Sequence, residues 1–330
     1  MDEDRLKSVY APVALRVLEA WRLAPARVEF VHVMENVTFR AERGGQKYVL
    51  RFHRPGYNTH AEMVSERMWL RALAASGLSV PEGVPTPEGR EFVAAEVDGE
   101  ERLVGLARWV EGEPLDRILA RTDDLERIEA YFEAIGRLAA GVHNASSNWT
   151  PPPQFTRRAW DADGLVGESP LWGRFWEVPD FSADECRTLA RARAHIRERL
   201  LEYGTDGQTY GLIHADLHPG NVLVDRAQAR LIDFDDAGFG WHVHELAVAL
   251  FNNQTSPHFG AMQAALVRGY RSRRQLADED LELLPLFLLM RNLMVIGWME
   301  QRPELRALYR RFRDSVKASA LLRIEALGPG

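Results

Sequence analysis

Two short polar motifs in the second half of the chain constrain its fold most. Residues 214–221 read His-Ala-Asp-Leu-His-Pro-Gly-Asn, and residues 231–235 read Leu-Ile-Asp-Phe-Asp. They alternate with apolar segments of the length and composition of β-strands, at 209–213, 221–225 and 229–233. A strand, a loop and a hairpin in this order bring the polar residues to neighbouring strand ends. The alternative is an ordinary surface hairpin, because Asp, Asn, Gly and Pro all favour turns, but turns require neither the histidine nor the second carboxylate.

Asp216, Asn221 and Asp233 carry the polar groups that phosphoryl transfer requires. One carboxylate accepts the proton of an attacking hydroxyl, while an amide and a second carboxylate hold the magnesium ion that neutralises phosphate oxygens. The order of residue types matches the catalytic loop and the Asp-Phe-Gly motif of protein kinases, with Ala215 in place of Arg and Asp235 in place of Gly. The motifs therefore predict a site for phosphate transfer.

The composition is that of an ordinary globular protein. The chain has 330 residues, of which 46% are hydrophobic and 27% are charged, and this length allows two cores. A formal net charge of -7 argues against nucleic acid as a partner, because such binding needs a basic surface. The single cysteine, Cys186, excludes an internal disulfide and fits a reducing compartment.

We expect a cytoplasmic protein with no membrane partner. The N-terminus is acidic where a secretory signal would be basic and then apolar. The most apolar stretch, 284–299, is interrupted by Arg291 and Asn292, so it is interpreted as a buried helix rather than a membrane span. No feature of the sequence indicates an oligomeric state.

Hydrophobic periodicity divides the chain near residue 110 and predicts an α+β fold. Before this point the spacing predicts helices at 5–22 and 59–76 and five strands of an antiparallel sheet at 28–34, 36–42, 46–51, 91–97 and 102–110. After it helices dominate, at 125–143, 183–203, 244–251, 259–270, 278–298 and 303–327. The predicted lobes are residues 1–110 and 111–330.

An irregular segment at 148–180 interrupts the helical part. It contains a run of three prolines and four of the nine tryptophans, Trp149, Trp160, Trp172 and Trp176. Indole rings anchor irregular segments by burying a large area at low entropy cost. An insertion packed onto the helical lobe and a lid over the substrate are equally good interpretations.

Arg51 lies inside the third predicted strand and is a candidate phosphate-binding residue. Strand alternation places it on one face with Lys47 and Val49, and the next helix offers Glu66 as an acidic partner. The alternative is an arginine in a surface ion pair. No glycine-rich loop lies at residues 34–36, where one would cover the phosphates of a kinase nucleotide.

Three other features leave alternatives open. Trp109 closes the fifth strand, where two lobes would be hinged; adenine recognition there would use backbone groups, and a plain connector is the equal alternative. His143, His242 and His244 lack carboxylate or cysteine partners at ligand spacing, so packed or exposed histidines are favoured over a metal site. Glu245 could accept backbone hydrogen bonds from residues 214–221, or could be a favourable charge at a helix N-terminus.

At these residues the chain resembles the aminoglycoside phosphotransferase / choline kinase family. Within it the similarity is greatest to the branch with type II homoserine kinases and bacterial stress response kinase A. The resemblance runs from about residue 30 to 250. It is carried by residues 35–36 and 38–40, 48–55, 66 with 69–70, 109–112, 160–161 with 171–173, 214–221, and 232–238 with 245–246. Two departures are Arg51, where most relatives have Lys, and Glu245, where Asp is usual.

The resemblance implies a bilobal protein-kinase-like fold with ATP and magnesium as cosubstrates. It implies Asp216 as catalytic base and Asn221 and Asp233 as metal ligands. It further implies nucleotide-binding and supporting residues, namely Arg51 paired with Glu66, together with Asn36, Trp109, His214, Asp235 and Glu245. The acceptor would be a hydroxyl of a small molecule, such as an amino alcohol, a hydroxy amino acid, a sugar or an aminoglycoside.

Two alternatives remain for the function. The first is a Ser/Thr protein kinase of the stress response kinase A type. The second is a catalytically silent nucleotide-binding regulator, suggested by Arg51 and the missing glycine-rich loop. The presence of Asp216, Asn221 and Asp233 together argues against the second alternative.

Overall fold

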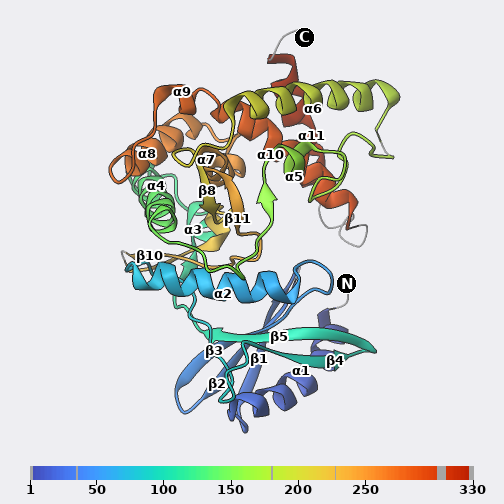
Figure 1. Ribbon diagram of the computed structural model, residues 1–330, viewed down its shortest axis with the longest axis vertical. Coiled ribbons are helices and arrows are strands. Elements are labelled where there is room, and N and C mark those ends of the chain that lie inside the picture. The colour runs from blue at the N-terminus through green and yellow to red at the C-terminus, as the bar shows by residue number, and fades with distance from the viewer. Residues whose placement is uncertain (1–2, 35, 180, 227, 303–309, 327–330) are drawn as a thin grey trace. The chain divides into compact units, whose positions relative to one another are not determined.

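The computed structural model describes residues 3–34, 36–179, 181–226, 228–302 and 310–326. The chain forms two compact units, which we name the sheet unit and the helical unit (Figure 1). The sheet unit comprises Met1–Gly112, Pro151–Thr156 and Leu223–Asp235, and the helical unit comprises the remaining segments. The later return of the chain to the sheet unit matters because the segment 223–235 carries Asp233 and Asp235.

The sheet unit contains the predicted five-stranded antiparallel sheet, and its strand order is β1-β2-β3-β5-β4. Figure 1 shows helices α1 and α2 on opposite sides of this sheet. The elements of the unit are α1 Glu3–Val17, a 3-10 turn Leu18–Trp21, β1 Arg27–Val33, β2 Val37–Arg43, β3 Gln46–Phe52, α2 His60–Ala75, β4 Phe92–Val97 and β5 Glu100–Arg108, followed later by β9 Val222–Asp225 and β10 Gln228–Leu231.

Local sequence explains where these elements turn and begin. The hairpin between β2 and β3 turns at Gly44 and Gly45, whose φ angles of 59° and 78° are open to glycine at little cost. Helix α2 begins with a capping box, in which Thr59 accepts from the Glu62 N–H and Glu62 accepts from the Thr59 N–H. These signals determine where β3 and α2 begin.

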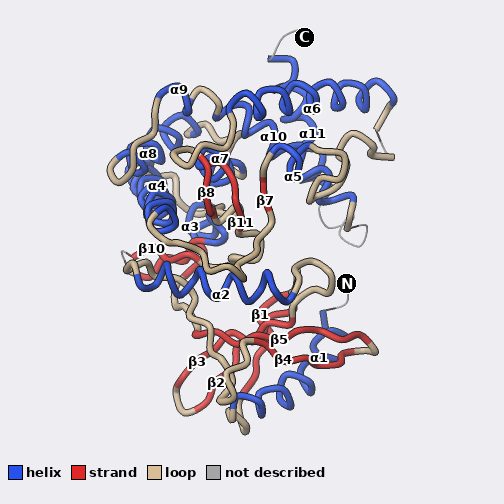
Figure 2. The backbone as a smooth tube through the Cα atoms, in the orientation of Figure 1, coloured by secondary structure: helices blue, strands red, loops and turns tan. Residues whose placement is uncertain are grey.

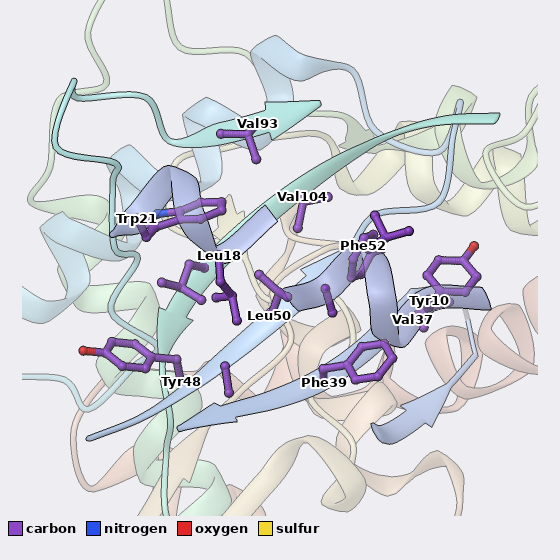
Figure 3. Packing of buried hydrophobic residues seen from close by; sticks show 14 of the residues in the cluster. Tyr10, Leu18, Trp21, Val37, Phe39, Tyr48, Leu50, Phe52, Val93 and Val104 are labelled. Carbon is purple, nitrogen blue, oxygen red and sulfur yellow. The ribbon is translucent and has the colours of Figure 1, made fainter. Parts of the chain in front are cut away.

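One face of the sheet forms the core of the unit (Figure 3). Alternate residues of the central strands point into it, and Leu18 and Trp21 pack against them from the N-terminal segment. The strand residues of this cluster are Val37, Phe39, Ala41, Tyr48, Leu50, Phe52, Val93, Val97, Val104 and Leu106. Because Leu50 and Phe52 face the core, Arg51 between them lies on the opposite face, as alternation predicts.

The helical unit contains most of the helices and a three-stranded sheet (Figure 2). Its sheet has the order β7-β11-β8, with β11 parallel to β7 and antiparallel to β8. The elements are β6 Glu113–Pro114, α3 Leu115–Leu119, α4 Leu125–Ser147, β7 Ala159–Trp160, α5 Ala162–Val166, α6 Ala183–Tyr203, β8 Tyr210–Ile213, a 3-10 turn Pro219–Asn221, β11 Gly238–Trp241, α7 His242–Phe251, α8 Phe259–Arg271, α9 Asp278–Leu281, α10 Leu284–Glu300 and α11 Arg310–Ala326.

Three predicted elements differ from the structure. The strand predicted at 229–233 ends at Leu231, because Asp233 adopts a left-handed φ of 65° that no strand accommodates. The helix predicted at 278–298 is divided into α9 and α10, because Pro285 in the first turn of α10 cannot continue a helix from before it. Of the helix predicted at 303–327, residues 303–309 and 327 lie outside the described residues.

Helices α4 and α8 cross at two reciprocal glycines. A Cβ on Gly136 of α4 would lie 2.0 Å from the Leu266 carbonyl oxygen, and a Cβ on Gly269 of α8 would lie 2.0 Å from the Glu133 carbonyl oxygen. Only glycine allows the two backbones to approach so closely. Because α4 also contacts β8, the crossing lies next to the strand that precedes the first polar motif.

The apolar helix α10 lies in the interior of the helical unit. The stretch Asp278–Glu300 is long and apolar enough to cross a membrane, but 72% of its most apolar window is buried inside the protein. It packs against α7 and α11. This burial is typical of a core helix, as the sequence predicts.

The tryptophans of the segment 148–180 anchor it to the helical unit. Trp160, Trp172 and Trp176 are buried. The Trp160 indole N–H donates to the Asp236 carbonyl at 2.8 Å, and Trp172 packs edge-on against Trp160. The burial favours the interpretation of a packed insertion.

Candidate active site

The catalytic-loop motif follows strand β8 in the helical unit and is held by Glu245. The backbone N–H groups of His214 and Ala215 donate to the two carboxylate oxygens of Glu245, each at 2.8 Å. Glu245 lies in the first turn of α7 and is fully buried. Burial raises the pKa of Glu245 to about 8, although the two backbone donors oppose the rise. Of the two interpretations offered by the sequence, the structure shows the backbone hydrogen bonds.

Ala215 turns the chain sharply before Asp216. Its φ is 63°, in the left-handed region that non-glycine residues rarely occupy, and such a conformation costs about 1 kcal/mol. The Glu245 carboxylate accepts from the N–H of Ala215 and from that of the preceding residue, His214. Strain that the surrounding hydrogen bonds maintain is common where a side chain must be presented at a fixed position.

Both carboxylate oxygens of Asp216 have partners. Arg291 Nη2 donates to Oδ1 at 2.5 Å, and Asn221 Nδ2 donates to Oδ2 at 2.9 Å. His218 Nε2 lies 3.4 Å from Oδ2. Burial opposes ionisation, but His218, Arg291 and His214 hold the pKa of Asp216 well below its ordinary value. Asp216 is therefore a carboxylate at neutral pH, the form that can accept a proton.

The structure brings the predicted base and one predicted metal ligand together. The Asn221 amide nitrogen donates to the backbone oxygen and to Oδ2 of Asp216, both at 2.9 Å. These bonds fix the orientation of the amide and leave its carbonyl oxygen Oδ1 as the atom able to bind a cation. Carboxamide and carboxylate oxygens are the protein ligands that magnesium prefers.

The second motif lies in the sheet unit, with Arg51. Arg51 Nη1 donates to Asp233 Oδ1 at 3.0 Å and to Asp235 Oδ1 at 2.9 Å. Burial alone would lower the pKa of the guanidinium, but Asp233, Asp235 and Glu66 hold it above its ordinary value. Arg51 thus remains charged between three acidic groups. It donates hydrogen bonds to the two aspartates, and Glu66, the predicted partner, also stabilises its charge.

Asp235 and Asn36 form a buried link within the sheet unit. Asn36 Nδ2 donates to Asp235 Oδ2, and Asn36 Oδ1 accepts from the Arg54 N–H at 3.0 Å. The Asp235 carbonyl accepts from Asn58 Nδ2 at 3.1 Å. The motif is therefore tied to the loop after β3 by side chains of Asn36 and Asn58. Asp235 occupies the position of the glycine in the Asp-Phe-Gly motif. An aspartate is accommodated there because each of its carboxylate oxygens has a hydrogen-bond partner.

Phe234 anchors the same motif on helix α2. Its ring packs edge-on against Trp69, with ring centroids 5.6 Å apart, and both rings are buried. Glu66 lies one helical turn before Trp69 and is also buried. The contact places the predicted acidic residue of α2 and the second motif on the same side of the sheet, together with Arg51.

Trp109 lies just after β5 and is half-buried. Its backbone N–H donates to the Lys47 carbonyl at 3.1 Å, and its indole N–H donates to Glu111 Oε2 at 3.3 Å. Lys47 Nζ donates to Glu111 Oε1 at 2.8 Å. Because the Trp109 N–H is already bonded, the predicted role in adenine recognition would need another backbone group of this segment.

Asn221 and Asp233 have the chemistry of ligands for a magnesium–nucleotide complex. Asp233 uses Oδ1 for Arg51, which leaves Oδ2 for a cation. Among the described residues no group of three or more His, Cys, Asp and Glu side chains has the arrangement of a metal site. Magnesium bound with a nucleotide needs only one or two protein carboxylates, since phosphates and water supply the other ligands.

Three histidines of the helical unit, His143, His242 and His244, are packed side chains. The rings of His143 and His242 stack with centroids 4.2 Å apart, and His143 Nδ1 forms a 2.8 Å hydrogen bond with the Tyr270 hydroxyl. His244 stacks on Phe287. Burial lowers the pKa of His242 and His244 to about 3 in each case. These residues are neutral at physiological pH.

Sequence reasoning did not assign Arg291 to the site. It appeared only as an interruption of an apolar helix, yet its guanidinium contacts the predicted base. A signal was available: an arginine inside a buried helix must pair with an acidic group, because an isolated buried charge is very costly. The sequence does not say which acidic group that is.

A model of the phosphotransferase enzyme family matches residues 28–279. The chain belongs to this family. The family that the sequence resembles is thereby confirmed, and the protein is a phosphotransferase that uses an alcohol group as acceptor.

Relatives of known activity within this family are small-molecule kinases. The chain is 28% identical over 286 residues to amicoumacin kinase of Bacillus subtilis (strain 168), covering 83% of this chain and 80% of the relative. It is 31% identical over 225 residues to homoserine kinase of Rhizobium meliloti (strain 1021), covering 65% and 60%. The solved structure of the microcompartment-associated aminopropanol kinase superposes with a TM-score of 0.82 at 32% identity, covering 95% of each chain. The predicted protein-kinase-like fold is confirmed by this similarity.

Proposed function

We propose that the protein transfers the γ-phosphate of ATP to a hydroxyl of a small molecule, with magnesium as the metal. The observation that carries this proposal is the state of Asp216. It is an ionised carboxylate at a strained strand end, fixed by Asn221 on one oxygen and by Arg291 on the other. A carboxylate so positioned is suited to accept the proton of an attacking alcohol.

Each proposed role follows from the donor atoms available. Asp216 takes the hydroxyl proton as the alcohol oxygen forms a bond to the γ-phosphorus and the bond from that phosphorus to the bridging oxygen of ADP breaks. Asn221 and Asp233 would hold magnesium with amide and carboxylate oxygens, and the ion would supply positive charge for the phosphate oxygens. Arg51 contributes a permanent positive charge for the ATP phosphates.

The supporting residues would act through these groups. Glu245 and His214 fix the backbone before Asp216. Asn36 and Asp235 fix the position of Arg51 and of the segment that carries Asp233. Positioning and charge neutralisation supply nearly all of the rate enhancement in phosphoryl transfer, so residues that hold the charged groups matter as much as those that contact substrate.

Consumption of ATP across a panel of acceptors tests the proposal. The panel contains homoserine, threonine, 1-amino-2-propanol, ethanolamine, choline, a hexose, an aminoglycoside and a generic protein substrate, each with and without magnesium. We expect magnesium-dependent formation of ADP and of a phosphorylated product with at least one small molecule. Phosphorylation of the protein substrate alone would contradict the assignment, and binding of ATP without transfer to any member would favour a silent regulator.

A further inference from the structure

Arg291 is oriented by packing more than by hydrogen bonds. It lies within α10, where 5% of its surface is exposed. Nη2 donates to Asp216 Oδ1, whereas Nε and Nη1 are buried without a hydrogen-bond partner among the described residues. A single hydrogen bond leaves a planar guanidinium free to turn about that bond. The orientation of the Arg291 side chain therefore depends on the groups that pack against it.

Two aromatic rings supply this packing. The guanidinium carbon of Arg291 lies 4.6 Å from the centroid of the Trp172 ring and 5.8 Å from that of Phe251. All three residues are buried. A guanidinium at such a distance is attracted to the face of the ring, and the attraction is stronger where water is excluded. Trp172, the nearer and larger ring, therefore contributes most to fixing the plane of the guanidinium.

Trp172 is itself held in place by its neighbours. Its ring packs edge-on against Trp160 with ring centroids 5.5 Å apart, and the Trp160 indole N–H donates to the Asp236 carbonyl at 2.8 Å. The backbone of Trp172 also lies directly on α10. A Cβ on Gly297 of that helix would lie 2.6 Å from the carbonyl oxygens of both Trp172 and Gly173. Because only glycine allows this approach, the segment cannot shift along the helix without losing the contact.

Asp216 needs a partner on each carboxylate oxygen to keep one orientation. Asn221 donates to Oδ2 and Arg291 donates to Oδ1. The torsion that turns an aspartate carboxylate about its Cβ–Cγ bond is soft, so a carboxylate bound on one oxygen alone can rotate. A displacement of about 1 Å at a reacting group can lower a rate by roughly 10²-fold. The donor on Oδ1 therefore matters for the rate as well as for stability.

We propose that Trp172 is a positioning residue for the catalytic base. Its ring fixes the guanidinium of Arg291, and Arg291 in turn fixes the plane of the Asp216 carboxylate. This inference rests on the proposed function, because Asp216 is the base of that reaction. It assigns to the tryptophan-rich segment 148–180 a part in catalysis that a merely packed insertion would not have.

A double-mutant cycle isolates this role from packing. The single-turnover rate of phosphate transfer is measured for the parental protein, Trp172→Leu, Arg291→Gln and the double variant. The substrates are ATP, magnesium and the acceptor of the panel above that reacts fastest with the parental protein. Trp172→Phe keeps an aromatic ring. Trp172→Met, which fills more of the space without a ring, replaces Trp172→Leu if that variant does not fold.

Trp176→Leu is the matched control. Trp176 belongs to the same segment, is also buried, and lies with its ring centroid 3.9 Å from the guanidinium carbon of Arg193. Arg193 pairs with Glu168 and not with the base. The control therefore removes the same kind of ring from the same kind of arginine.

We expect Trp172→Leu to lower the rate at saturating substrates by about 10- to 100-fold, within the contribution of a general base. Its affinity for AMP-PNP, measured by calorimetric titration, should be unchanged. In the Arg291→Gln background the same substitution should cause no further loss, because both residues act through one contact. Trp172→Phe should retain most of the parental rate, and Trp176→Leu all of it.

Three results would overturn the inference. One is a parental rate in Trp172→Leu. Another is an equal loss from Trp172→Leu in the parental and Arg291→Gln backgrounds, since the ring would then act independently of the arginine. The third is an equal loss in Trp176→Leu and Trp172→Leu, which would assign both effects to the stability of the helical unit.

Crystal structures of Trp172→Leu and Trp172→Phe separate this inference from the proposed function. We expect a turned Arg291 guanidinium and a displaced Asp216 carboxylate in Trp172→Leu, and parental positions in Trp172→Phe. An unmoved carboxylate in Trp172→Leu would contradict the inference alone. A displaced carboxylate in a protein that transfers phosphate to no member of the panel would support the positioning contact and contradict the proposed function.

Discussion

Substitution of Gly136 by alanine tests the packing that supports the catalytic loop. In an isolated helix this change is favourable by about 1 kcal/mol, because glycine is a poor helix former. Here the new Cβ would lie 2.0 Å from the Leu266 carbonyl oxygen and 2.7 Å from the Tyr270 nitrogen. Both atoms belong to the backbone of α8 and cannot rotate away, as the end of a flexible side chain could.

The magnitude follows from the distance that the helices must move. Real Cβ contacts are at least 3.0 Å, so α4 and α8 must separate by roughly 1 Å at this point, a gap that forfeits a quarter to a half of each van der Waals contact along the crossing. Overpacking of this kind typically costs 1–3 kcal/mol. Since the clash is with backbone atoms, we expect the free energy of unfolding to fall by about 3 kcal/mol. For a unit of this size that corresponds to a Tm lower by roughly 6–12 °C.

Gly260→Ala is the matched control on α8. A Cβ there meets no atom within 4 Å, so the substitution should be neutral or stabilise the protein by up to about 1 kcal/mol. Urea unfolding of both variants, followed by circular dichroism, gives the comparison. Equal stability of Gly136→Ala and Gly260→Ala would refute the close helix crossing.

Two further predictions concern α7. Glu245→Ala leaves the buried N–H groups of His214 and Ala215 without an acceptor. We therefore expect its free energy of unfolding to fall by about 2–6 kcal/mol and its turnover to decrease, with Glu245→Asp intermediate in both. An unchanged urea midpoint in Glu245→Ala would contradict the anchoring role. His244 has a pKa of about 3 in the folded protein, so between pH 6.5 and pH 3 this histidine is protonated only in the unfolded chain. The stability that neutral His244 provides is therefore complete above pH 6.5 and is lost as the pH falls toward 3. His244→Phe should reduce the slope of unfolding free energy against pH by about 1.4 kcal/mol per unit between pH 4 and 5.5; parallel curves for parent and variant would contradict this.

Periodicity was a sufficient guide to most of the fold. The five strands of the sheet unit and most of the long helices were predicted within a few residues, because apolar residues recur along them at the period of a strand or a helix. The short strand β11, Gly238–Trp241, was not predicted, since two glycines in four residues carry no alternation. Its pairing with β7 and β8 depends on tertiary contacts that local sequence does not encode.

The candidate site was predictable where a motif is local and not where it depends on distant residues. Asp216 and Asn221 lie five residues apart, and their hydrogen bond follows from one turn of chain. Arg291 reaches Asp216 from a separate helix, and the partners of Asp235 are Asn36 and Arg51. These pairs join residues far apart in the chain. The sequence shows which side chains are charged, but only the fold shows which of them are partners.

The assignment of Asp216 as proton acceptor is the central claim of this account. It is tested most directly by single-turnover phosphoryl transfer with Asp216→Asn at saturating magnesium, ATP and acceptor, alongside calorimetric titration of AMP-PNP. The account predicts a rate about 10²- to 10⁴-fold below that of the parental protein, the usual contribution of a general base, with nucleotide affinity nearly unchanged. Transfer at the parental rate by Asp216→Asn would contradict it.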